Sequence, residues 1–287
     1  MTRRDEEILR AVYAYQALTT QQISDLLFVP VDVIMPPKPH SRVRHRLKGL
    51  YHHGLLSRHE QPHILAEGRK PFLYQLDRKG AEWLAHQEDG GTQALEWKPG
   101  ETLSALFLEH LLAGNNVRIA IVRSAARHGF TIETWLDERT LKQVQNKDTV
   151  VLTSATGKKQ KAAVVPDGYY HLRTDAHHYY QFIEIDRASV TGSSKNWTRR
   201  TWARKVHTFL EYYRSGKYHA RYHTKSMRVL TVTTGQTRLA NLRRITEENG
   251  GKARFWFTTF ERVLASDILT DPIWEVAGSK DRRSLVW

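Results

Sequence analysis

The segment YYQFIEID, residues 179–186, is the feature that most constrains the fold of this chain. Its bulky apolar residues predict a strand, and successive side chains of a strand point to opposite faces. Ile183 and Ile185 therefore share one face, and Glu184 and Asp186 share the other. Two carboxylates on a strand in apolar surroundings are costly unless a positive charge lies nearby. The segment thus predicts a buried strand that carries a charged site on one face.

A third carboxylate, Asp167, stands at the end of the preceding predicted strand, within the tripeptide Pro166-Asp167-Gly168. A hairpin that pairs these strands would bring Asp167 close to Glu184 or Asp186. Three such oxygen ligands suit a hard divalent cation, and we expect Mg²⁺ or Mn²⁺. The alternatives are a turn role for Asp167 and acidic residues that pair with Arg187 or face solvent.

One lysine lies within the apolar stripe of the next predicted helix, at 198–214. At helical spacing Trp202, Val206 and Phe209 share a face, and Lys205 falls beside Phe209. A lysine that faces the sheet needs an anionic partner, and the acidic strand is the nearest candidate. We therefore expect Lys205 to lie next to that strand.

Two further positions are candidates for the metal's ligand shell. Glu138 follows a predicted strand at 130–136, and Glu109 or His110 lies on a predicted helix at 102–127. His110 lies in the apolar stripe of that helix, so a hydrogen-bonded core histidine is the competing interpretation.

The pattern after residue 100 predicts a mixed α/β arrangement. The helix at 102–127 is expected to be interrupted at AGNN, residues 113–116. It is followed in order by strands at 130–136, 161–170 and 179–186, a helix at 198–214, a strand at 228–234, a helix at 237–249 and a strand at 253–260.

The chain before residue 90 has the parts of a winged helix-turn-helix. Three helices are expected at 5–17, 19–27 and 41–53, with Thr19 or Thr20 capping the second and Ser41 the third. Strands at 55–60 and 71–77 form a basic hairpin, and a helix follows at 80–86. In such a domain the third helix enters the major groove and the wing contacts the DNA backbone. The candidate DNA-binding residues are Arg42, Arg44, His45, Arg46, Lys48, Arg69 and Lys70, with Arg199 and Arg200 from the basic run at 195–205.

A winged helix can also serve protein contacts or dimerisation, which is the alternative interpretation. The Gly- and Pro-containing stretch after residue 87 is typical of a linker. We therefore expect a winged-helix domain at 1–90, a linker at 91–100 and an α/β domain at 101–287.

The second domain resembles a divergent member of the PD-(D/E)xK nuclease superfamily. Pro166-Asp167 matches the first half of the motif, and Glu184-Ile185-Asp186 stands where Glu-x-Lys is usual. The layout of the chain is a winged helix, then this module with EIDR, and then W-x-x-K at 202–205. This layout is similar to that of the replication-relaxation family of plasmid and mobile-element proteins. The resemblance covers roughly residues 5–265.

This resemblance implies a restriction-endonuclease-like α/β fold and hydrolysis of a DNA phosphodiester bond. It makes Asp167 and Glu184 metal ligands. Asp186 departs from the family pattern because it occupies the position of the usual lysine. Either catalysis has been lost, or Lys205 on the following helix supplies the missing charge.

Composition fits a nucleic-acid partner. The 287 residues include 44 Lys and Arg against 30 Asp and Glu, a net charge of +14, which favours binding of a polyanion such as double-stranded DNA. The lack of cysteine excludes disulfides and thiolate chemistry. The charged N-terminal residues are unlike a signal peptide, and no apolar run approaches the roughly 20 residues needed to cross a bilayer, so the cytoplasm is the expected location.

Two functions remain open at this point. One is a Mg²⁺- or Mn²⁺-dependent endonuclease or nickase in plasmid or mobile-element replication or transfer. The other is a DNA-binding initiator, accessory factor or repressor without catalysis. Both are compatible with a homodimer and with contacts to replication or transfer proteins. A relaxase with a histidine-bound metal predicts a His-x-His motif, which this chain lacks.

Overall fold

A computed structural model describes residues 1–33, 38–61, 70–87, 104–154, 156–188, 192 and 201–286. The chain forms two compact units, Met1–Ile119 and Ala120–Trp287, and the division falls inside helix α5 (Ala105–Arg127). The predicted linker at 91–100 lies outside the described residues, as do residues 195–200 of the basic run. Each unit is described by itself.

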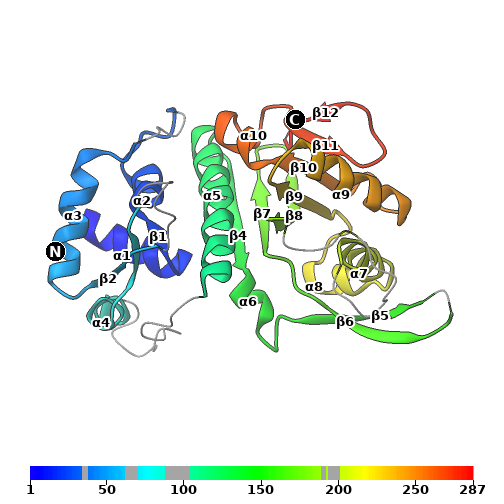
Figure 1. Cartoon of the computed structure of the whole chain (residues 1–287), viewed down its shortest axis with the longest axis horizontal. Coiled ribbons are helices and arrows are strands. Elements are labelled where there is room, and N and C mark those ends of the chain that lie inside the picture. The colour runs from blue at the N-terminus through cyan, green and yellow to red at the C-terminus, as the bar shows by residue number, and fades with distance from the viewer. Residues whose placement is uncertain are drawn as a thin grey trace. The chain divides into compact units, whose positions relative to one another are not determined.

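The first unit combines helices with a small antiparallel sheet whose strand order is β1-β3-β2 (Figure 1). Ile8, Leu47 and Leu56 are among the fully buried side chains that join the helices to the sheet. Besides the first turns of α5, its elements are α1 (Arg3–Tyr15), β1 (Leu18–Thr19), α2 (Thr20–Leu27), α3 (Ser41–His52), β2 (Leu56–His59), β3 (Leu73–Leu76) and α4 (Arg78–Gln87).

The predicted helices and strands of this unit are present, and one of the two predicted caps differs. Thr19 is the N-cap of α2, and its hydroxyl accepts the Gln22 backbone N–H at 3.1 Å. The expectation that Ser41 caps α3 is wrong, because α3 begins at Ser41 and the N-cap is His40. The His40 Nδ1 atom accepts the Arg42 backbone N–H at 3.3 Å.

Helix α5 runs without a break through AGNN, so the predicted interruption is wrong. A glycine inside a helix costs about 1 kcal/mol relative to alanine. Here tertiary hydrogen bonds hold the same turn in place. Asn115 Nδ2 donates to the carbonyl oxygens of Tyr15 and Ala17 at 3.1 and 2.7 Å, and Gln22 Nε2 donates to Leu112 O at 2.9 Å.

The second unit is a mixed α/β structure around a seven-stranded sheet of order β12-β11-β10-β9-β8-β7-β4. Strand β9 is parallel to both of its neighbours, and the other pairs are antiparallel. The strands are β4 (Thr131–Asp137), β7 (Gly168–Arg173), β8 (His178–Asp186), β9 (Arg228–Thr233), β10 (Phe255–Thr259), β11 (Trp274–Val276) and β12 (Arg282–Arg283).

Helices α7 and α9 pack against one face of this sheet (Figure 1). Phe182 on β8, Phe209 on α7 and Leu242 on α9 are buried together there. This face is therefore the one that also receives Glu184 and Asp186, two and four residues after Phe182. The helices of the unit after α5 are α6 (Glu138–Lys142), α7 (Trp202–Arg214), α8 (Lys217–Tyr222), α9 (Gln236–Glu248) and α10 (Phe260–Ala265).

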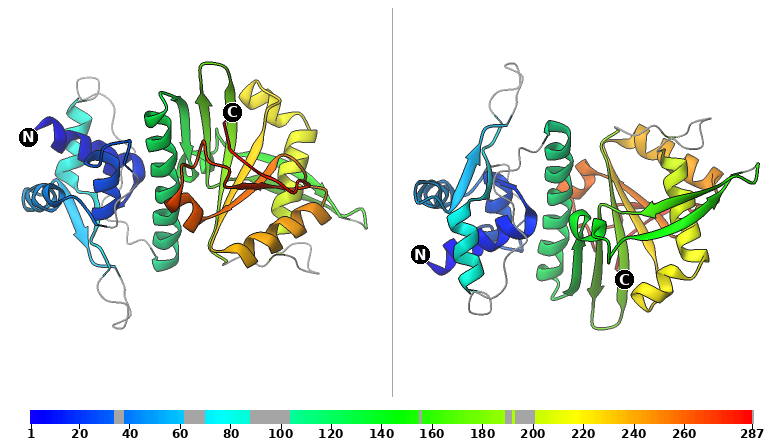
Figure 2. Two further views of the ribbon diagram at one scale, coloured as in Figure 1. Left: turned by 90° about the horizontal axis from the view of Figure 1, so that it is seen from above. Right: turned by 90° about the horizontal axis from the view of Figure 1, so that it is seen from below.

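The strand predicted at 161–170 is two strands, whereas the predicted hairpin with the strand at 179–186 is present as β7 and β8. Strand β6 (Lys159–Val164) pairs with β5 (Asp148–Thr153) in a separate ribbon beside α7, and β7 begins only at Gly168 (Figure 2). Pro166 lies between them and has no N–H to donate to a ladder. Asp167 therefore lies where the chain passes from the ribbon into the large sheet.

Candidate active site

Asp167 is fixed to strand β8 by two backbone hydrogen bonds. Its N–H donates to Ile183 O at 3.0 Å, and its Oδ2 accepts the Ile185 N–H at 2.7 Å. These bonds lie on either side of Glu184 in sequence. The predicted proximity of Asp167 to Glu184 is therefore present, although the turn between β7 and β8 lies at 174–177 rather than at Pro166-Asp167-Gly168.

Glu184 is almost completely buried, with 1% of its surface exposed, and it pairs with Lys205 of α7. Lys205 Nζ donates to Glu184 Oε2. The other oxygen, Oε1, is buried and has no hydrogen-bond partner in the described part of the chain. Lys205 thus lies where the helical stripe predicted it, against the acidic strand, and one Glu184 oxygen remains unused.

A second buried oxygen without a partner among the described residues belongs to Thr231 on β9. Thr231 lies in register with Glu184 across the parallel β8–β9 pair. Their side chains therefore stand on the same face of adjacent strands. Sequence reasoning did not single out Thr231, because threonine in a strand carries no signal beyond strand propensity.

The charges of this group shift one another's pKa. Burial raises the pKa of Glu184 well above its usual range. The Lys205 charge lowers this pKa, and the nearby Asp167 charge raises it further. Burial alone lowers the pKa of Lys205, but the negative charges of Glu184, Asp167 and Glu138 outweigh burial and raise it. Lys205 is therefore a cation within reach of three carboxyl groups.

Asp186 is held away from this group. Its Oδ2 accepts the Thr233 hydroxyl at 2.6 Å and Arg238 Nε at 2.9 Å, and its Oδ1 accepts Arg238 Nη2 at 2.8 Å. A two-residue step along a strand spans about 7 Å, and the first turn of α9 brings Arg238 to that point. This paired carboxylate corrects the expectation that Asp186 joins Asp167 and Glu184 as a metal ligand.

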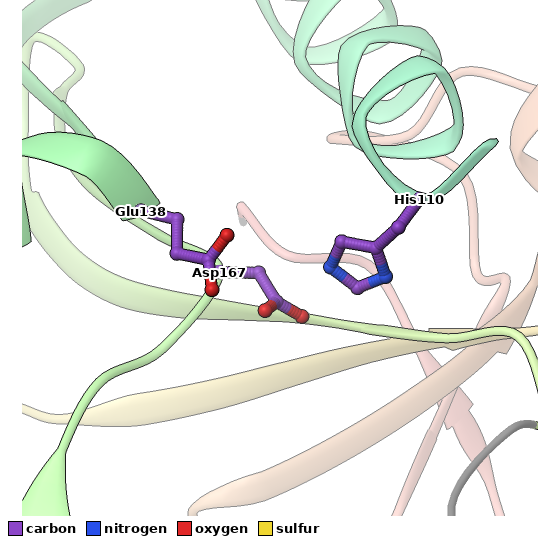
Figure 3. Close-up of side chains that lie close together, drawn as sticks. All are labelled: His110, Glu138 and Asp167. Atoms are coloured by element: carbon purple, nitrogen blue, oxygen red, sulfur yellow. The ribbon is translucent and has the colours of Figure 1, made fainter. Parts of the chain in front are cut away.

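Glu138, one of the weaker sequence candidates, lies near Asp167 in the second unit. Glu138 opens helix α6, and one of its carboxylate oxygens lies within 4.8 Å of an oxygen of Asp167. Figure 3 shows these two carboxylates close together. The other candidate, His110, lies on the part of α5 that belongs to the first unit, and its role as a ligand stays a prediction.

The predicted DNA-binding residues divide into three groups. Arg42, Arg44, His45 and Lys48 are exposed on α3. Arg46 is instead paired with Asp5 of α1 at 2.8 Å and donates to the Thr2 hydroxyl, and Lys70 lies 3.8 Å from Glu109. Residues Arg69, Arg199 and Arg200 lie outside the described residues.

The fold and site define the class of this chain as a mixed α/β protein with a buried carboxylate–lysine group on an interior strand of a β-sheet. A model of the replication-relaxation family matches residues 9–228, well over half of the chain, and the chain belongs to this family. No curated protein matches it. No helix in the described part of the chain is long and apolar enough to cross a membrane.

Two solved structures of the restriction endonuclease FokI, one of them bound to DNA, are weakly similar to the chain. Each is 14% identical and covers 91% of this chain, with TM-scores of 0.28 and 0.26. The chain spans only 43% of the FokI chain. Similarity this low carries no weight for fold or function.

Proposed function

We propose that this protein is a metal-dependent DNA endonuclease or nickase that acts in plasmid or mobile-element replication or transfer. The observation that carries the proposal is the contact of Lys205 with Glu184 beside Asp167. Asp167 directly precedes β7, Glu184 lies on β8 and Lys205 lies on α7. The helices and strands around them follow the order α5, β4, β7, β8, α7 and β9, with α6 and the β5–β6 ribbon inserted between β4 and β7. That order is the one expected of a PD-(D/E)xK module.

The residues present fit a hard divalent cation such as Mg²⁺ or Mn²⁺. Glu184 Oε1 is a buried oxygen without a hydrogen-bond partner among the described residues, and Asp167 and Glu138 add further carboxylates. Asp167 and Glu184 would hold the ion, with Glu138 as a further ligand. When bound, the ion would lower the pKa of a water ligand and neutralise charge on the scissile phosphate.

The side chains of the site have separate roles in this proposal. Lys205 keeps its positive charge, because its neighbours raise its pKa, and it stabilises negative charge that develops on the phosphate. The two backbone hydrogen bonds of Asp167 hold its carboxylate at a fixed point on β8. The Asp186–Arg238 pair keeps the end of β8 against α9 without joining the reaction.

DNA is the substrate that the charge distribution favours. The sequence of the second unit contains 29 Lys and Arg against 16 Asp and Glu, a net charge of +13 out of the total of +14. The first unit is nearly neutral, but α3 exposes Arg42, Arg44, His45 and Lys48 on one helix. We assign duplex binding to α3 of a winged helix, and phosphate binding to the second unit as well.

The test is incubation of the full chain with supercoiled plasmid DNA in Mg²⁺ or Mn²⁺, with EDTA as the control. Open-circular or linear product should appear only with the metal. The product should carry no covalently attached protein, because a metal-activated water leaves no adduct. Tight DNA binding with no cleavage in either metal would instead support a DNA-binding initiator or repressor without catalysis.

A further inference from the structure

A cavity of about 420 Å³ opens on the second unit beside the candidate active site. Its floor is the part of the large sheet formed by β4, β7 and β8, and helices α6 and α8 contribute walls. Because α7 and α9 cover the β8–β10 part of this face, the cavity lies where the helical cover ends. Its volume lies within the range of small-molecule sites.

The lining is aromatic and contains no carboxylate. The Tyr180 ring stacks on His171, with ring centroids 4.3 Å apart and planes 15° apart. The Tyr222 ring lies 4.3 Å from that of Tyr169, which belongs to the floor. His171, Tyr180 and Tyr222 are half-buried, and Tyr180 and Tyr222 also pack against the core that contains Tyr169.

Polar groups are present at fixed positions among these rings. The Asn146 side-chain amide donates to Thr140 O at 3.0 Å and to Gln143 Oε1 at 3.2 Å, which orients its Oδ1 as an acceptor. Arg221 is held by both carboxylate oxygens of Asp148. Burial, followed by the neighbouring His178, lowers the pKa of His171, so this ring is neutral near pH 7. The cavity is thus a stacking site with fixed hydrogen-bonding groups and little net charge.

The cavity and the carboxylate–lysine group share two elements. Tyr169 follows Asp167 by two residues, or about 7 Å along the chain where it is extended. Leu141, which also lines the cavity, follows Glu138 by one turn of α6, about 4.5 Å along the helix axis. A phosphodiester at the acidic group therefore has the adjoining nucleoside within reach of the cavity.

We propose that this cavity binds the unpaired nucleobase of the nucleotide adjoining the scissile phosphate. A base inside a duplex is stacked and paired, so it reaches such a cavity only from a single strand or after eversion. Aromatic rings bind bases of any sequence by stacking, and the net charge of the unit attracts the backbone. The inference rests on the proposed function and names its substrate as a strand that is unpaired next to the cleavage point.

The test uses the full chain in EDTA with oligonucleotides that carry 2-aminopurine at successive positions, as a single strand and as its paired duplex. Binding should quench the fluorescence of one position in the single strand. Tyr180→Leu should weaken single-strand binding by about 5- to 100-fold and remove this quenching, whereas Tyr180→Phe should stay within about twofold. Tyr213→Leu is the matched control, because Tyr213 packs on Arg254 outside the cavity.

A second variant guards against misfolding. Thr134 is an exposed residue that lines the cavity, and Thr134→Trp should block it while leaving the core intact. The proposal is overturned if Tyr180→Leu and Thr134→Trp both bind the single strand with normal affinity and quenching. If these variants bind normally and still cleave DNA with metal, the proposed nuclease activity stands and the cavity is not part of its substrate site. If one position is quenched but no metal supports cleavage, base binding in the cavity stands and the proposed nuclease activity is rejected.

Discussion

Asp167→Asn is expected to reduce Mg²⁺- or Mn²⁺-dependent DNA cleavage by about a thousandfold or more. The variant exchanges a charged ligand for a neutral amide at the centre of the proposed site, so both the ion and the charge it supplies are weakened. The amide oxygen can still accept the Ile185 N–H, so the fold of β8 should be kept. The measurement is the rate of plasmid nicking at saturating DNA.

Asp175→Asn provides the matched control for this substitution. Asp175 is an exposed acid in the turn between β7 and β8, at the other end of β7 from Asp167. Its neutralisation should leave the nicking rate within about twofold. An Asp167→Asn protein that is folded and nicks DNA at the normal rate would remove Asp167 from the mechanism.

Lys205→Met should lower both activity and stability. The loss of a cation next to the reacting phosphate is expected to cost about 10²- to 10³-fold in nicking rate. At pH 8 the free energy of unfolding should fall by about 3–5 kcal/mol, because removal of one partner leaves Glu184 buried without its counter-charge. Lys225→Met, at an exposed lysine of the same unit, should change stability by less than about 0.5 kcal/mol.

The stability loss in Lys205→Met should depend on pH with a defined sign. Without Lys205, burial and Asp167 raise the pKa of Glu184 unopposed, so the folded protein holds this proton more tightly than the unfolded chain. Such a group favours folding below its unfolded pKa and loses that contribution as pH rises through the folded pKa. Urea unfolding should therefore show a smaller gap from wild type at pH 5 than at pH 8. An equal gap at both pH values would contradict the assignment of Glu184 as the group left unpaired.

The long elements were predictable from sequence because their apolar periodicity is strong. The stripe of α7 even placed Lys205 correctly, since a helix of this length fixes the direction of each side chain. Strand β8 was predicted for the same reason, and the alternation in FIEID correctly put Glu184 and Asp186 on one face.

The predictions from sequence failed where tertiary contacts determine the local structure. No residue near Asp186 in the sequence indicates that it pairs with Arg238. Arg238 is 52 residues away and reaches Asp186 only after β9 and α9 have formed. Likewise, the apolar residues on both sides of Pro166 predicted one continuous strand. The chain is divided there because β6 pairs with β5 in a separate ribbon, which is a tertiary interaction. The interruption predicted at AGNN is absent because Asn115 donates to the last residue of α1, Tyr15, and to Ala17 in the loop that follows.

Binding of a metal ion between Asp167 and Glu184 is the central requirement of the proposed nuclease. Anomalous diffraction at the manganese edge, from crystals of the full chain soaked in Mn²⁺, measures this without any assumption about the DNA site. We expect a peak between the two carboxylates that is absent from Asp167→Asn crystals. No peak there, with Lys205 Nζ still bonded to Glu184 at millimolar Mn²⁺, would contradict the proposal and leave a DNA-binding protein whose acidic strand has no catalytic role.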